Sequence, residues 1–117
     1  MKKDNVIKIK SFLFAVRVVN LYKFLTEDKR EFIISKQLLR SGTSIGANVR
    51  EAEHAESKAD FIHKLSISLK EANETEYWLE LLNETNYLSS SDYISIQNDI
   101  KEILKLLTSI IKTSKQK

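Results

Sequence analysis

Two pairs of residues in the sequence have the types and spacing of metal ligands. Glu51 precedes His54, and Asp60 precedes His63, each by three positions. In di-iron helical bundles, a Glu-x-x-His pair on each of two helices points into the core. The expected direction of the His63 side chain argues against a metal site here, because His63 lies about 160° around its expected helix from the core residue Leu65. We therefore expect solvated polar side chains, no metal and no other cofactor.

A second candidate chemistry is phosphate binding by the second quarter of the chain. Lys36, Arg40 and Arg50 fall within about 80° of each other on the expected helix, with small residues between them. Small residues flanked by cations leave room for the phosphate backbone of RNA or DNA. The alternative is a solvated basic face, because three charges make a short patch and nonspecific binding needs many contacts. Repetition of the patch in an oligomer would favour the first interpretation.

Three polar residues fall on or beside expected core faces. Glu76 and Arg17 lie among apolar residues of their helices, and Asn48 borders the inner face of its own. A buried charge must be paired, because leaving it unpaired is costly. The sequence therefore predicts a buried polar network of Arg17, Asn48 and Glu76 that fixes helix register. A general acid would also need a pocket and a partner base, for which the sequence offers no sign. We assign no catalytic residue and do not expect an enzyme.

The elements that must position these residues are amphipathic helices. A chain of 117 residues with no Pro, no Cys and two Gly is typical of one small all-α domain. Apolar periodicity and capping residues predict helices over about residues 5–25, 29–53, 58–84 and 92–113, followed by a basic C-terminal tail. The predicted start of the second helix is based on an Asp28-x-x-Glu31 capping pattern. The start of the third is based on Ser57 with Asp60, and the start of the fourth on residues 89–92. Short connections between long helices predict an antiparallel up-and-down four-helix bundle.

Two glycines lie inside the second predicted helix. Gly42 and Gly46 are four residues apart and share one side of it. Each costs about 1 kcal/mol relative to alanine, so close approach of another backbone is the expected compensation. A kink at this point is the alternative.

The first and third predicted helices carry apolar residues on two sides. On the first helix, one side contains Leu13, Phe14, Val18, Leu21 and Leu25, and the other contains Ile9, Phe12, Val16 and Val19. The third helix has a second apolar side as well, nearly opposite its core face. Three partner helices cannot cover a helix on both sides, so a second subunit is expected to do so. Scattered surface apolar residues are the alternative. The predicted subunit interface comprises Phe12, Val16, Val19, Ile67, Trp78 and Leu81.

Charge is distributed unevenly along the chain. Residues 1–50 contain eleven Lys or Arg and four acids, residues 51–102 contain four and twelve, and the remaining fifteen contain four lysines and no acid. This asymmetry fits either contacts between subunits or a surface for phosphate. No apolar run approaches the roughly 18 residues of a membrane span, and no export signal is evident. Together with the absence of cysteine, this predicts a cytoplasmic protein without a membrane partner.

Three segments of the sequence resemble one protein family. They are QLLRSGTSIGANVREA at 37–52, DFIHKL at 60–65 and KEANETEYWL at 70–79. The chain is similar, over nearly its whole length, to the bacterial four-helix-bundle proteins encoded in intervening sequences of large-subunit ribosomal RNA genes. Arg40, Ser44, Ile45 and Asn48 match that family's Arg-x-x-x-Ser-Ile-x-x-Asn pattern.

The resemblance implies a homopentameric ring and a distant relationship to the accessory variability determinant protein of diversity-generating retroelements. That protein binds nucleic acid and a reverse transcriptase. The resemblance implies no catalytic residues.

The sequence thus supports two hypotheses of function. The first is a nonenzymatic homo-oligomer that binds nucleic acid, with RNA preferred over DNA, through basic faces of the second helix and the chain ends. The second is a protein-interaction scaffold, in which the charge asymmetry serves subunit contacts only. Salt-dependent binding of RNA distinguishes them, because only contacts with phosphates require it.

Overall fold

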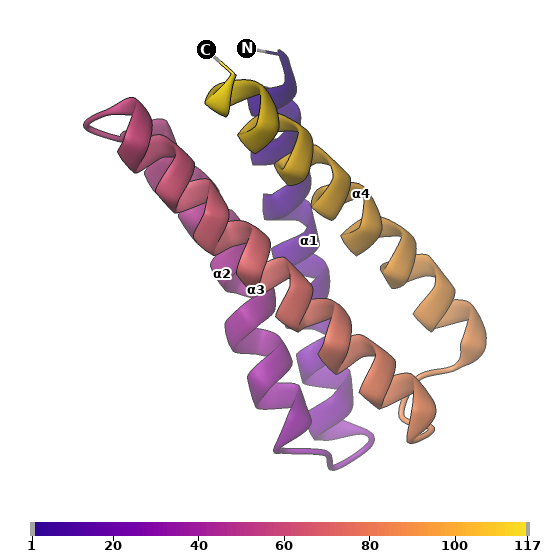
Figure 1. The fold of residues 1–117 in the computed structure, drawn as a ribbon. Coiled ribbons are helices and arrows are strands. Elements are labelled where there is room, and N and C mark those ends of the chain that lie inside the picture. Colours follow the sequence, from indigo (N-terminus) through magenta and orange to yellow (C-terminus); the bar gives the residue numbers. More distant parts are fainter. Residues whose placement is uncertain (1, 117) are drawn as a thin grey trace.

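Four helices joined by three short connections make up the part of the chain that the structure describes. A computed structural model describes the backbone of residues 2–116 and the side chains of residues 5–116. The helices are α1 (Lys2–Glu27), α2 (Ile34–Glu53), α3 (Lys58–Glu84) and α4 (Ser90–Lys115). They run alternately up and down, and each packs on two others, so that α1 and α3 lie diagonally opposite (Figure 1). The predicted all-α antiparallel four-helix bundle is confirmed.

The bundle is long and opens at one end. Its extents are 47 × 22 × 19 Å. The start of α1 and the end of α4 lie side by side at one end of the bundle. The α2–α3 connection is at that end too, but it is separated from them (Figure 1). The core runs along the axis and includes Phe14, Leu38, Leu79 and Ile100, all almost fully buried.

The start of α2 differs from the sequence prediction. It begins at Ile34, five residues later than expected, because Asp28 still continues the end of α1 through a 2.9 Å bond from its backbone N–H to the carbonyl of Phe24. The backbone then turns through Arg30, which has a φ of 56°. Glu31 caps α2 in place of Asp28: its carboxylate accepts hydrogen bonds from three backbone N–H groups, those of Ile33, Ile34 and Ser35. The Asp28-x-x-Glu31 capping prediction was therefore wrong.

The capping segments predicted for the other two helices are confirmed, although α4 begins at Ser90, two residues before the predicted position. The hydroxyl of Ser57 accepts a 3.0 Å bond from the N–H of Asp60 at the start of α3. The hydroxyl of Ser89 accepts a 3.2 Å bond from the N–H of Asp92 in the first turn of α4. At its other end α4 continues to Lys115, into the segment predicted as a tail.

The two glycines bring α1 and α2 together. A Cβ placed on Gly46 would lie 3.2 Å from the backbone carbonyl oxygen of Ser11, which confirms the predicted close approach of a backbone. At Gly42 the neighbour is a side chain instead, with both methyl groups of Val18 at 2.8 Å from such a Cβ. The helix continues through both positions.

Candidate interaction surfaces

Arg40 is held by acidic side chains of α3. Its guanidinium forms ion pairs with Glu71, at 3.2 Å, and with Glu74. The indole N–H of Trp78 donates to the same Glu74 carboxylate at 2.9 Å. The central cation of the predicted phosphate patch is thus compensated within the subunit, and it is linked to a residue of the predicted interface through Glu74.

The other two cations of that patch are exposed. Lys36 and Arg50 form no ion pair with another side chain among residues 5–116. They are 14 positions apart on α2, which corresponds to about 21 Å along the helix. Arg50 borders a groove of about 380 Å³ between α1 and α2, whose other walls include Phe12, Gly46 and Ala47. Among the described residues, the three predicted cations therefore comprise one in ion pairs and two without one, and their role in binding stays a prediction.

A continuous apolar surface lies on the solvent side of α1. Ile9 and Leu13 are each 60% exposed, Phe12 is 55% exposed and Val16 is 44% exposed. We call these four residues the outer face of α1. They lie opposite the buried residues Ile7, Phe14 and Val18. Leu13 had been grouped with the inner side on sequence alone, and the structure places it on the outer face.

The remaining predicted interface residues are half-buried. Val19, Ile67, Trp78 and Leu81 each keep part of their side chain accessible. Beside Trp78, Tyr77 is 56% exposed, and the two rings meet edge to face with centroids 5.0 Å apart. A second, smaller aromatic surface therefore lies on α3, and its role as an interface is a prediction.

The predicted buried polar network is wrong. Arg17, Asn48 and Glu76 are all half-buried. Arg17 pairs at 2.7 Å with Asp99 of α4, and also donates to the hydroxyl of Ser95. The side-chain amide of Asn48 donates to the backbone carbonyl of Ser44, one turn earlier on α2.

Glu76 belongs instead to an acidic row beside the start of α4. Burial raises the pKa of the Tyr93 hydroxyl, and the negative charges of Glu80, Glu76 and Glu84 raise it further. These carboxylates of α3 therefore face α4 rather than Arg17.

Small hydroxyl residues supply the polar groups that are in fact buried between α2 and α3. Thr75 donates to the hydroxyl of Ser41 at 2.9 Å, and Ser68 donates to the backbone carbonyl of Ile45 at 2.9 Å. The sequence reasoning missed them because it searched for charges. Their positions on the inner faces of their helices were the available signal.

The acid and histidine pairs are used for other contacts. Glu51 accepts a bond from Lys64 at 3.1 Å, and the carboxylate of Asp60 accepts from the backbone N–H of Glu56. His54 has 80% of its side chain exposed. Among the described residues, no group of three His, Cys, Asp or Glu side chains is arranged to hold a metal ion.

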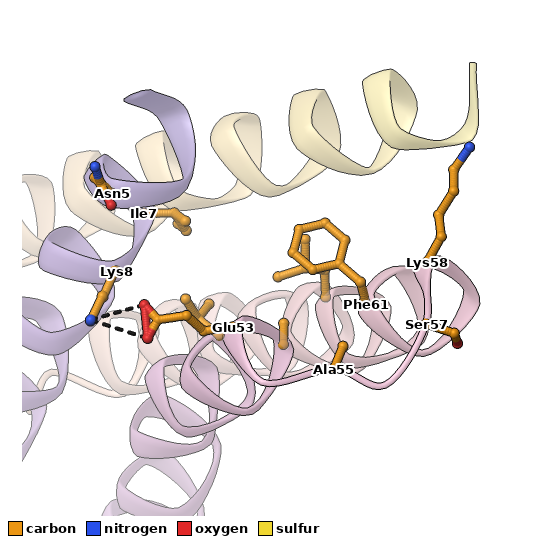
Figure 2. Close-up of a pocket in the computed structure, with 11 residues that line it drawn as sticks. Asn5, Ile7, Lys8, Glu53, Ala55, Ser57, Lys58 and Phe61 are labelled. Carbon is orange, nitrogen blue, oxygen red and sulfur yellow. Dashed lines mark hydrogen bonds and ion pairs between the residues drawn. The ribbon is translucent and has the colours of Figure 1, made fainter. Parts of the chain in front are cut away.

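A cavity of about 430 Å³ lies at the open end of the bundle (Figure 2). Its apolar wall includes Ile7, Val49 and Phe61, and its rim carries Lys8, whose amine forms an ion pair of 2.9 Å with Glu53. The hydrogen bond from Lys8 holds the pKa of the Glu53 carboxyl below its usual range, although burial acts in the opposite direction. The side chains around the cavity thus offer apolar area and a compensated ion pair rather than an acid and base poised for proton transfer.

Fold and surfaces together define a small antiparallel four-helix bundle with an exposed apolar helix face and clustered surface charge. The sequence matches the family described as 23S rRNA-intervening sequence protein over residues 3–109, and the chain belongs to that family. A search of curated proteins found no match.

One solved structure similar to this chain is a protein of unknown function from the S23 ribosomal protein family of Bacteroides thetaiotaomicron VPI-5482. The two sequences are 69% identical, and the alignment covers 94% of this chain and 98% of that one with a TM-score of 0.93. Within the described residues, no helix is both long and apolar enough to span a bilayer.

Proposed function

We propose that this protein is a nonenzymatic, homo-oligomeric helical bundle of the cytoplasm that binds RNA through basic surfaces. The family name, which refers to intervening sequences of 23S rRNA, supports a connection with RNA. The distant relationship to the retroelement accessory protein, which the family resemblance implies, supports it too. The number of subunits, five, rests on the resemblance described above.

The observation that carries self-association is the outer face of α1. Each of its four large side chains is roughly half exposed, so covering them would contribute about 1 kcal/mol apiece. A monomer gains nothing from four adjacent apolar residues on its solvent side, whereas a subunit contact does.

The positions of α1 and α3 in the bundle fit a ring. A ring requires head-to-tail contacts, in which one face of a subunit meets a different face of the next. Because α1 and α3 are diagonal and do not pack on each other, their solvent sides point away from one another. The outer face of α1 and the surface around Tyr77 and Trp78 are therefore suited to be the two halves of a head-to-tail interface.

The second candidate is a protein-interaction scaffold with no role in nucleic-acid binding. It is favoured by the ion pairs of Arg40 with Glu71 and Glu74, which remove the central charge from the predicted patch on α2. In this case the acidic and basic segments serve contacts between subunits only.

Two measurements on the purified protein test the proposal. Light scattering should give a mass about five times 13.6 kDa, and nucleic acid that copurifies should be sensitive to ribonuclease. A monomer would refute the self-association. Absence of RNA binding even at roughly 50 mM salt, which favours nonspecific contacts, would replace the first candidate with the second.

A further inference from the structure

A row of lysines runs along the solvent side of α4. Lys101, Lys105, Lys112 and Lys115 are all exposed, and none forms an ion pair with another described residue. All four belong to the same helix, Ser90–Lys115. At 100° and 1.5 Å per residue, they fall within an arc of about 80° and extend over about 21 Å. We call these four residues the α4 lysine row.

Five other cations in the described part of the chain are compensated by carboxylates. Lys8 pairs with Glu53, Arg17 with Asp99, and Lys64 with Glu51. Arg40 and Lys10 also have carboxylate partners. On α2 only two cations are without an ion pair among residues 5–116, and these are far apart. The α4 lysine row is therefore a denser array of uncompensated charge than the patch predicted on α2.

Helix stability does not account for the whole row. Lys112 and Lys115 lie in the last turn of α4, where cations offset the helix dipole. Lys101 and Lys105 lie in the middle of the helix, where that effect is absent. The cost of gathering four like charges on one face thus needs another explanation.

The surroundings of the row separate it from the acids of the molecule. The acidic row of α3 acts on Tyr93, near the start of α4, whereas the lysine row extends to its other end. Glu102 is the carboxylate on α4 closest in sequence to the row, and it is engaged by Lys10 of α1.

We infer that the α4 lysine row is the surface that contacts the phosphate backbone of RNA. This inference rests on the proposed function and moves the main contact from α2 to α4. Lysines are point charges that suit phosphates contacted without base recognition, and an extended straight row suits a polymer better than a single anion. A lipid surface fits less well, because the apolar side of α4, including Ile100 and Leu107, is buried in the core and is not available to enter a bilayer.

The test compares two double variants that remove the same charge. Lys105→Ala/Lys112→Ala removes the two inner lysines of the row, and Lys23→Ala/Lys70→Ala removes two exposed lysines from α1 and α3. Alanine is the best helix former, so all four positions should stay helical, which circular dichroism checks. Binding of labelled poly(U) RNA is measured by fluorescence anisotropy as salt is raised.

The expected results follow from the release of counterions. With four phosphate contacts, the affinity of the parent should fall about 50- to 150-fold between roughly 50 and 200 mM salt. With two contacts left, the affinity of Lys105→Ala/Lys112→Ala should fall only about 7- to 12-fold over the same range. The Lys23→Ala/Lys70→Ala control should follow the parent.

Three results would overturn the inference. If the parent binds poly(U) and both double variants keep its salt dependence, the row is not the contact surface, although the proposed function stands. The same conclusion follows if Lys36→Ala/Arg50→Ala flattens the dependence and the α4 variant does not. If the parent binds no RNA but binds phosphatidylserine vesicles through the row, the partner is a membrane, and the proposed function fails as well.

Discussion

Replacing Glu31 with alanine tests the least expected local feature of the fold, the capping of α2 from the preceding loop. The Glu31 side chain is buried, with only 8% of its surface exposed. One carboxylate oxygen accepts from the N–H groups of Ile33 and Ile34, at 3.1 and 3.0 Å, and the other accepts from Ser35 at 2.6 Å. Alanine would leave all three donors without this acceptor, and Ser35 is fully buried.

The magnitude follows from the strength of such contacts. Loss of an N-cap costs about 1 kcal/mol, and a hydrogen bond to a charged group contributes about 1.5–3 kcal/mol. The three bonds share one carboxylate and are not additive, so we expect Glu31→Ala to lower the free energy of unfolding by about 2–3 kcal/mol. For a chain of this size, that corresponds to a fall in Tm of about 8–12 °C.

The effect should depend on pH in a defined direction. Burial raises the pKa of the Glu31 carboxyl, but the N–H groups of Ile34, Ser35 and Ile33 together outweigh it and hold the pKa below its ordinary value of 4.5. A carboxylate whose pKa is lowered in the folded state stabilises the fold above its unfolded pKa. The stabilisation is lost as pH falls through the folded value. The difference in Tm between parent and Glu31→Ala should therefore be constant near neutral pH and shrink below about pH 4.5.

Two neighbouring acids serve as controls for this prediction. Glu27 is exposed near the end of α1, and Asp28 is the cap that the sequence pattern favoured. Alanine at either position should change the free energy of unfolding by no more than about 0.5 kcal/mol. Urea denaturation at neutral pH measures the free energy of unfolding of all three variants. If Asp28→Ala is as damaging as Glu31→Ala, or if Glu31→Ala unfolds like the parent, the assignment of the cap is incorrect.

Three further outcomes are expected. Gly42→Ala should destabilise the fold by about 1–2 kcal/mol, because its Cβ would meet both methyl groups of Val18 at 2.8 Å; denaturation should show the loss much reduced in a Val18→Ala background. Phe12→Asp should lower the mass measured by light scattering toward 13.6 kDa while circular dichroism keeps its helical signal, and an unchanged mass would exclude Phe12 from the interface. Arg17→Ala should cost no more than about 1 kcal/mol in urea denaturation, because its ion pair with Asp99 is partly solvated; a loss near that of a buried pair would contradict this.

Local rules were sufficient for much of the fold. The caps of α3 and α4 were predictable because the hydroxyls of Ser57 and Ser89 accept hydrogen bonds from backbone N–H groups three residues later. Donor and acceptor of such a bond lie in the same short segment, so the sequence alone identifies both. Helical periodicity likewise predicted the four-helix bundle, since each core stripe repeats along a single helix. Gly46 signalled a close contact because a glycine inside a helix has a cost that packing must offset.

Contacts between side chains of two different helices became clear only from the structure. The sequence indicates on which side of α1 Arg17 lies. Its ion pair with Asp99, however, depends on how α4 packs against α1. The ion pairs of Arg40 were unpredictable for the same reason, because Glu71 and Glu74 come close to it only when α3 packs on α2. Even the cap of α2 required the turn at Arg30, which brings Glu31 rather than Asp28 to the helix start. Sequence periodicity determines which side of a helix is buried, whereas the partner of a side chain at the edge of that side is set by distances between helices that only the packed bundle defines.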